Sequence, residues 1–208
     1  MSGYVIVGLG NPGRRYAGTR HNVGFLVADV LAQRGGMHLG PNARLRAEVA
    51  EGRLGPLPGT RVVLAKPLTF MNDSGGAVAG VLRFYSGDLD RLIVVHDEID
   101  IPFGTLRVKT GGGDNGHNGL KSVRASLKSG EFTRVRVGVG RPASPTAASR
   151  APHSDPGAAQ RGDIAGWLLS DFSAAERALL PELVERAADA VEHLTGYDLA
   201  DTQSRFNS

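Results

Sequence analysis

The sequence predicts an α/β protein: a single three-layer domain in which a twisted, mostly parallel mixed sheet carries helices on both faces. Short apolar runs bounded by glycine or proline, typical of buried strands, alternate along the chain with segments whose apolar residues recur at helical spacing. Such alternation favours a parallel sheet covered by helices on both sides. The length of 208 residues is below the size at which cores usually divide, so one domain over residues 1–208 is expected.

The first half of the chain supplies three strands and two helices. In order, we expect a buried strand over 4–9, a polar loop over 10–22, a helix from Val23 that ends before Gly35, a half-exposed strand over 45–51, a central strand over 61–66, a loop over 67–73 and a helix capped by Ser74. Alternating apolar and polar residues mark the half-exposed strand, and Pro67 ends the central one because proline has no N–H to donate. A serine before a helix can accept a bond from an unpaired backbone N–H.

The second half continues the alternation. In order, we expect strands over 92–96 and 106–109, a glycine-rich loop over 111–116, a helix over 117–127, a strand over 135–139, a flexible insertion at about 143–163 and a helix from Ser173 to about Leu194. Ser173 and Glu176 have the spacing of a capping box. Pro181 should kink or restart the last helix, because it removes one backbone hydrogen bond.

Composition excludes several classes of protein. No apolar run approaches the ~20 residues of a membrane-spanning helix. The chain has no cysteine, so disulfides and thiolate metal sites are excluded, and its first residues do not resemble a secretory signal. We therefore expect a soluble cytoplasmic protein. Glycine, at 29 residues, is about twice as frequent as usual but not periodic, which indicates tight turns rather than a fibrous protein.

Charge is unevenly distributed although the net charge is only +3. Residues 105–141 hold eight lysines and arginines against two acids, and residues 171–201 hold eight acids against two arginines. A basic face of this kind attracts phosphates, although a solvated mixed surface is the commoner explanation at so small a net charge. Charge alone favours a nucleic-acid partner only weakly.

Gly8-Leu-Gly-Asn-Pro-Gly13 matches the pattern of a dinucleotide-binding turn, but its context does not. Pro12 removes an amide donor, and the polar residues that follow leave no helix N-terminus against the turn to hold a pyrophosphate. We interpret these glycines as a tight turn and expect no cofactor.

Polar side chains gather where the expected strands end. The residues concerned are Asn11, Tyr16 and His21 after the first strand, Asn72 after Pro67, His96, Asp97 and Glu98 at the end of the strand that begins at Leu92, and His117 and Asn118 after the glycine-rich loop. If the strands are parallel, these groups converge at one edge of the sheet. A histidine, a carboxylate and several amides can provide a base, an orienting group and oxyanion donors for hydrolysis without a metal.

Each of these residues also has a structural explanation. A lone loop histidine is usually a surface side chain, His96 and Asp97 can cap a strand end, and Asn118-Gly119 is a common turn. Phe70 and Met71 suit either a core anchor or an exposed contact for a ligand. Histidines near carboxylates also permit a metal site, but no His-x-x-x-His spacing appears.

Four ordered blocks resemble a known family. The blocks are Gly8-Leu-Gly-Asn-Pro-Gly-x-x-Tyr16 with Thr19-Arg-His-Asn-Val-Gly24, Pro67-Leu-Thr-Phe-Met-Asn72-x-Ser-Gly75, His96-Asp-Glu-Ile-Asp-Ile-Pro102, and Gly116-His-Asn-Gly-Leu-Lys121 followed by Arg134-Val-Arg-Val-Gly-Val-Gly140. Together they resemble bacterial peptidyl-tRNA hydrolases. The resemblance implies a monomeric cytoplasmic enzyme that cleaves the ester between a peptide and the terminal ribose of tRNA, so recycling tRNA dropped by ribosomes.

The resemblance also implies roles for individual residues. It makes His21 the general base and Asp97 its orienting group. It assigns Asn11 to the distinction between a blocked and a free amino group, and Asn72 and Asn118 to the binding of substrate and water. The residues that it assigns to binding of the peptide and the tRNA acceptor end are Tyr16, Phe70, Met71, His117, Lys121, and, as a clamp on the 5′ phosphate, Lys109 and Arg136.

Two departures from the family pattern concern tRNA binding. Residues 143–163 are longer than the usual connection, and Asp171 precedes Phe172 where a basic residue often stands. Two other functions stay open. The fold is similar to that of plant organellar splicing factors, which bind RNA without catalysis, and to metal-dependent maturation proteases with a related sheet.

Overall fold

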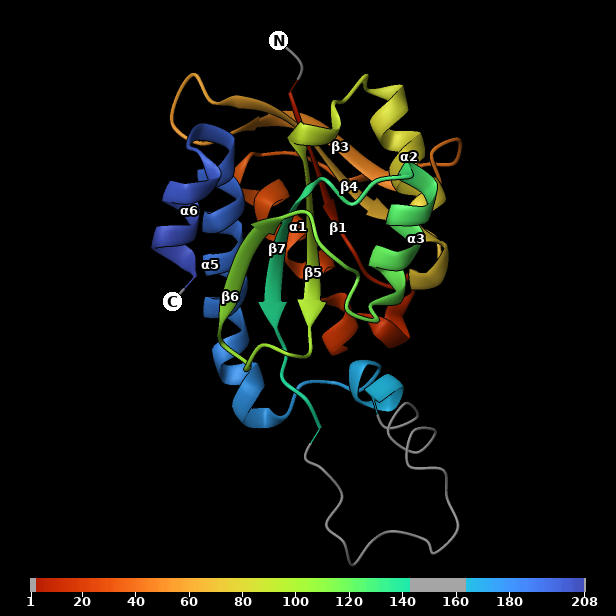
Figure 1. The fold of residues 1–208 in the computed structure, drawn as a ribbon, viewed down its shortest axis with the longest axis vertical. Helices are drawn as coiled ribbons and strands as arrows, with labels where there is room; N and C mark the ends of the chain where they lie inside the picture. The colour runs from red at the N-terminus through yellow and green to blue at the C-terminus, as the bar shows by residue number, and fades with distance from the viewer. Residues whose placement is uncertain (1–2, 143–163, 208) are drawn as a thin grey trace, which may run out of the picture.

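A seven-stranded mixed sheet forms the centre of the protein, and its four inner strands are parallel (Figure 1). We describe residues 3–142 and 164–207 of a computed structural model. The strands, in their order across the sheet, are β2 (Gly40–Asn42), β3 (Ala47–Leu54), β4 (Thr60–Pro67), β1 (Tyr4–Gly8), β5 (Leu92–Glu98), β7 (Thr133–Gly138) and β6 (Leu106–Thr110). The outer strands β2, β3 and β6 pair antiparallel with their neighbours. The predicted mostly parallel mixed sheet is confirmed.

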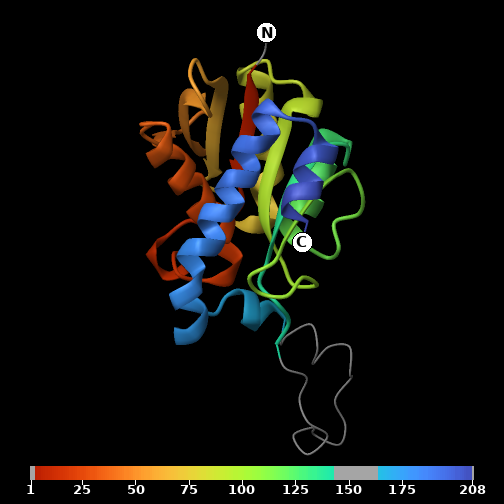
Figure 2. The ribbon, with the colours of Figure 1, turned by 90° about the vertical axis from the view of Figure 1, so that its left-hand side faces the viewer.

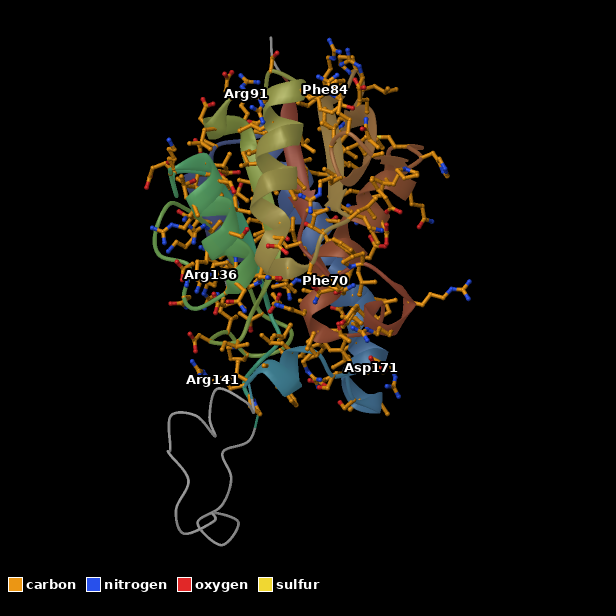
Figure 3. The ribbon with its side chains drawn as sticks, turned by 90° about the vertical axis from the view of Figure 1, so that its right-hand side faces the viewer. Phe70, Phe84, Arg91, Arg136, Arg141 and Asp171 are labelled. Atoms are coloured by element: carbon orange, nitrogen blue, oxygen red, sulfur yellow. The ribbon has the colours of Figure 1, made fainter. Side chains whose placement is uncertain are left out.

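Helices cover both faces of this sheet, as predicted. The helices are α1 (Val23–Arg34), α2 (Ser74–Phe84), α3 (Asn118–Leu127), α5 (Ala174–Gly196) and α6 (Leu199–Phe206). Figure 2 shows α5 and α6 in front of the strands, and Figure 3 shows α2 and α3 on the opposite side. The fold is therefore a single three-layer α/β domain.

Each helical layer encloses its own hydrophobic core. One cluster joins α1, α5 and α6 to side chains such as Ile93 and Val135, and the other joins α2 and α3 to Val94 and Val7. Adjacent residues of β5 thus serve opposite cores, as the two-residue period of a strand requires. Since β5 is buried along its whole length, its polar residues His96, Asp97 and Glu98 are held inside the protein.

Several predicted boundaries are confirmed and one detail, the cap of α2, is wrong. The first helix ends before Gly35, and Ser173 forms the predicted capping box with Glu176. Ser74 does not cap α2, because a 3-10 turn over Met71–Asp73 leads directly into the helix and makes Ser74 its first residue. Of the kink or restart predicted at Pro181, the restart does not occur, because α5 continues through this residue as one helix.

Some elements lie outside what the sequence analysis described. It missed the edge strand β2 and the helix α6, which are too short to show a clear apolar period. Residues 164–168 are helical. The predicted flexible insertion at about 143–163 lies outside the described residues. Among the helices of the described ranges, none is long and apolar enough to cross a membrane.

Candidate active site

A pocket of about 270 Å³ lies where the carboxyl ends of β1, β4 and β5 meet. Seven of the residues that sequence analysis selected line it, together with three from the segment after residue 163: Asn11, Tyr16, His21, Phe70, Met71, Asn72, Asn118, Ala165, Leu168 and Leu169. Figure 3 shows Phe70 near the start of α2, with Phe84 at the far end of that helix. A hollow of about 540 Å³ near Arg53 and Arg61 contains none of the predicted site residues.

His21 lines this pocket and contacts Asp97, which does not line it. His21 lies in a 3-10 turn over Arg20–Asn22, directly before α1, and Asp97 lies near the end of β5. The Nδ1–H of His21 donates to Oδ1 of Asp97 over 2.8 Å. Gly24 brings the start of α1 onto the strands, because a Cβ there would lie 2.5 Å from the carbonyl oxygen of Val95. With Nδ1 engaged, Nε2 is the His21 nitrogen left to act on a ligand.

Burial and charge oppose each other in this pair. Burial disfavours the protonated form of His21, but the Asp97 carboxylate and its hydrogen bond outweigh burial and raise the pKa of His21 above its ordinary 6.5. Burial likewise disfavours an ionised Asp97, yet His21 and His117 together hold its pKa well below the usual range. Asp97 is therefore a buried carboxylate, 1 % exposed, that stabilises a positive charge on His21.

His117 also binds Asp97 and does not line the pocket. It precedes α3, where its Nδ1 accepts a bond from the backbone N–H of Leu120 over 3.2 Å. Its Nε2 must then carry the hydrogen, which it donates to Oδ1 of Asp97 over 3.0 Å. Because both ring nitrogens are engaged, the geometry favours a role in holding Asp97 over the predicted contact with substrate.

Asn11 is fixed so that one end of its amide faces the pocket. Its Oδ1 accepts from the backbone N–H of Met71 over 2.8 Å, which leaves the Nδ2 hydrogens for a ligand. Two further bonds of 2.9 Å join the backbone of Asn11 to the side chain of Asn22. Asn22 was not among the predicted site residues, although its place beside His21 in the first of the four sequence blocks is a signal that could have found it.

The rest of the pocket is built from side chains that differ in exposure, from the buried Met71 to the half-exposed Phe70. Tyr16 and Phe70 meet edge to face with ring centroids 6.2 Å apart, and Phe70 is 52 % exposed. Asn72 and Asn118 are exposed on opposite elements of the rim, before α2 and at the start of α3. An apolar wall with amides around a histidine suits a ligand that has both apolar and carbonyl groups.

A second, smaller cavity of about 70 Å³ contains the predicted clamp residues Lys109 and Arg136. They lie on the neighbouring strands β6 and β7, on the sheet face that α3 covers. Arg136, near α3 in Figure 3, donates from Nε and Nη2 to Oε2 of Glu98 over 3.1 and 2.9 Å. Lys121 is exposed on α3 and lines neither cavity.

Comparison with known proteins identifies the family. The family model described as peptidyl-tRNA hydrolase matches residues 5–208. The chain belongs to the peptidyl-tRNA hydrolase family. Peptidyl-tRNA hydrolases of Frankia alni and Streptomyces coelicolor are 52 % and 49 % identical to it, covering 99 % of this chain and 94 % and 95 % of their own length. The crystal structure of peptidyl-tRNA hydrolase from Acinetobacter baumannii has a TM-score of 0.84 at 32 % identity and covers 100 % of this chain and 96 % of its own.

This membership confirms the predicted family, enzyme class and reaction. The chain is a peptidyl-tRNA hydrolase by family, and the reaction of the family is hydrolysis of the ester bond in peptidyl-tRNA. Three of the groups beside the pocket have the chemistry to bind a metal. The ligand atoms of His21, Asp97 and His117 all lie within 4.8 Å of one another.

Hydrogen bonds already use these three groups. A metal on His117 would have to replace the hydrogen that Nε2 donates to Asp97, because Nδ1 is engaged with Leu120. Asp97 would lose its hydrogen bonds from both histidines. The donor set thus fits a hydrogen-bonded catalytic centre better than a zinc site, whose carboxylate and histidines bind the ion directly.

Arg20, for which the sequence suggested no role, ties the turn that carries His21 to the C-terminal segment. Its buried guanidinium stacks 3.5 Å from the ring centroid of Trp167 and pairs with Glu176 over 2.7 Å. It also donates to the carbonyl oxygen of Asp171 over 2.7 Å. Asp171, labelled in Figure 3, therefore contacts the loop that carries His21 through its backbone. Arg20 fixes the turn in which His21 lies.

Proposed function

We propose that His21 is the general base with which this chain hydrolyses peptidyl-tRNA. The observation that carries the proposal is the 2.8 Å hydrogen bond to Asp97 from His21, which lines the pocket. Nε2 of His21 accepts a proton from water as the water oxygen attacks the ester carbonyl carbon. The bond from that carbon to the ribose oxygen then breaks, and His21 returns the proton to the ribose oxygen. The products are a peptide acid and tRNA.

The other pocket residues hold the substrate in this account. The amides of Asn72 and Asn118 hold the attacking water and the carbonyl oxygen, where negative charge develops in the transition state. Tyr16, Phe70 and Met71 form the wall against which the peptide and the terminal nucleotide pack. Asp97 orients His21 and stabilises its protonated form, and His117 positions Asp97.

We propose tRNA, bound through its acceptor end, as the partner of a monomer that works in the cytoplasm on peptidyl-tRNA released from ribosomes. Support for tRNA binding comes from the cationic cavity of Lys109 and Arg136, which lies on the same sheet as the pocket. Lys121 adds a positive charge on the exposed side of α3.

Incubation with N-acetyl-aminoacyl-tRNA tests the proposed activity against its alternatives. We expect release of the N-acetyl amino acid at the same rate with and without EDTA, because no step of the proposal uses a metal. Binding without release would favour a non-catalytic RNA-binding protein. Loss of activity in EDTA that zinc restores would favour a metal-dependent hydrolase.

Replacement of Asn11 by aspartate should change selectivity more than rate. The introduced carboxylate can keep the bond from Met71 with one oxygen, and its other oxygen would replace the pocket-facing NH₂ group. That NH₂ donor suits a peptide carbonyl but cannot pair an ammonium, so the wild-type site pays a desolvation cost of about 1 to 3 kcal/mol for a free amino group. Asn11→Asp should narrow the ratio of kcat/KM for N-acetyl-aminoacyl-tRNA to kcat/KM for aminoacyl-tRNA.

Asn11→Ala provides the matched control for this change. It removes the donor without adding charge, so it should slow cleavage of the blocked substrate without improving cleavage of the free-amine form. A ratio for Asn11→Asp within about twofold of wild type, or ~0.4 kcal/mol, would mean that Asn11 does not distinguish the two amino groups.

Replacement of Lys109 or Arg136 by alanine should mainly raise KM for full-length tRNA substrates. Each change should also reduce the log–log salt slope by about one unit or less, if each side chain neutralises one phosphate. A minimal substrate without a 5′ phosphate should be cleaved almost as before. Equal losses on both substrates would indicate that these residues support the fold or the catalytic pocket instead.

A further inference from the structure

Glu98 places a buried negative charge inside the cavity that Lys109 and Arg136 line. It is the last residue of β5, next to Asp97 in the chain, and its side chain is 5 % exposed. Oε2 accepts both bonds from Arg136, whereas Oε1 has only longer contacts, 3.3 Å from the backbone N–H of Asp100 and 3.5 Å from Nδ2 of Asn115. Arg136 is thus the main hydrogen-bond partner of the Glu98 carboxylate.

Three cations surround this carboxylate on one face of the sheet. Lys109 pairs in register with Arg134, and Arg136 lies two residues further along β7. Arg134 is buried and donates to the backbone carbonyls of Gly112 and Gly113 over 2.7 and 2.6 Å, so it holds the glycine-rich loop. The Lys109 ammonium forms no hydrogen bond or ion pair with any described residue, so it is left for a ligand.

The cavity keeps an excess of positive charge despite Glu98. Burial and the neighbouring Arg136 and Arg134 lower the pKa of Lys109 from its ordinary value, and the opposing effect of Glu98 does not cancel theirs. An anion that entered the cavity would relieve this repulsion. The same anion would also meet the Glu98 carboxylate, which occupies one edge of the Arg136 guanidinium.

We propose that Glu98 is a specificity-determining residue that lowers the affinity of the Lys109 and Arg136 site for the 5′ phosphate of tRNA. The proposal rests on the proposed function, in which that site receives the phosphate. The guanidinium of Arg136 has a fork of five donors, and Glu98 uses those on Nε and Nη2, so a phosphate must bind the remaining edge. Glu98 stays in place, because a buried carboxylate without its partner is costly.

A weakened phosphate site suits an enzyme that must release its product. The tRNA product keeps the same 5′ phosphate as the substrate, so every increase in phosphate affinity also slows product release. Interactions that bind substrate and transition state equally lower KM without raising kcat. The negative charge of Glu98 near the phosphate sets the balance between substrate binding and product release.

The test replaces Glu98 by glutamine, which keeps an oxygen to accept from Arg136 but removes the charge. For wild type and E98Q, kcat/KM is measured on N-acetyl-aminoacyl-tRNA that carries either a 5′ phosphate or a 5′ hydroxyl. Taking the ratio of the two values within each protein cancels any effect of the substitution on chemistry. We expect the ratio to rise about threefold or more in E98Q, because a like charge has left the phosphate site. Inhibition by deacylated tRNA with a 5′ phosphate should tighten by a similar factor.

Two outcomes would overturn the inference. One is an unchanged ratio in E98Q, and the other is a lower ratio, which would make Glu98 only a support that holds Arg136 in position. Should E98Q fail to fold, Arg136→Lys provides the second test. A lysine is a point charge, and its pairing with Glu98 would leave no donor edge for a phosphate. The phosphate-to-hydroxyl ratio of kcat/KM should therefore fall to that of Arg136→Ala. A ratio equal to that of wild type would contradict the proposal.

Separate controls distinguish failure of the underlying site. If Lys109→Ala and Arg136→Ala leave the phosphate-to-hydroxyl ratio as in wild type, the 5′ phosphate does not bind this cavity, and the proposed function is wrong on that point. If both lower the ratio and E98Q does not raise it, only the inference about Glu98 fails.

Discussion

His21→Ala is expected to slow ester cleavage by about 10²- to 10⁴-fold while leaving the fold and tRNA binding nearly intact. A positioned general base contributes about 10²- to 10⁴-fold, and no other described histidine both lines the pocket and has a ring nitrogen free to act on water. His21 lies in a turn between β1 and α1 and is not part of either hydrophobic cluster. The measurement is kcat/KM on N-acetyl-aminoacyl-tRNA.

The exposed His38 provides a matched control for this substitution. It lies on the chain before β2, remote in sequence from every pocket residue, so His38→Ala should keep wild-type activity. Thermal unfolding and the dissociation constant for deacylated tRNA check that His21→Ala is folded and binds. A folded His21→Ala protein that retains a tenth of wild-type activity would remove His21 from its role.

Asp97→Asn should reduce activity by about ten- to a thousandfold, less than loss of the base itself. Asparagine keeps an oxygen near the two histidines but no longer stabilises a positive charge on His21. Its NH₂ group can also face His21 and force the proton onto Nε2, which is the nitrogen that must accept. Asparagine is nearly isosteric with aspartate, so the substituted protein should fold, and circular dichroism checks this. Full activity in the folded variant would remove Asp97 from the mechanism.

The convergence of the predicted site follows from the topology of the sheet. Asn11, Asn72 and Asp97 each follow or end a parallel strand, and the carboxyl ends of such strands meet at one edge. The apolar runs that fix those strands are visible in the sequence, so both the edge and its polar residues could be predicted. Sequence order alone could not show that the Asp97 carboxylate accepts hydrogen bonds from two histidines.

Other features depend on contacts between side chains distant in sequence. Arg136 was predicted as part of a clamp on the 5′ phosphate, and nothing in the sequence showed that Glu98 on the neighbouring strand β5 binds it. His117 was predicted to contact substrate, but the start of α3 directs its ring toward Asp97. Ser74 was predicted as a cap because its type suits one, whereas the preceding 3-10 turn makes that cap unnecessary. The residue type at a position predicts the chemistry of the side chain better than it predicts which other side chain it contacts.

The pH dependence of kcat/KM for wild type and Asp97→Asn tests the central claim most directly. The base works only when neutral, so activity must fall as the pH drops through the pKa of His21. Asp97 raises the pKa of His21 above 6.5, so the acidic limb of the wild-type profile should lie above that value. Without the carboxylate charge only burial remains, and burial lowers the pKa of His21. We predict that the acidic limb moves to lower pH in Asp97→Asn, and an unmoved limb, or one at higher pH, would contradict the account.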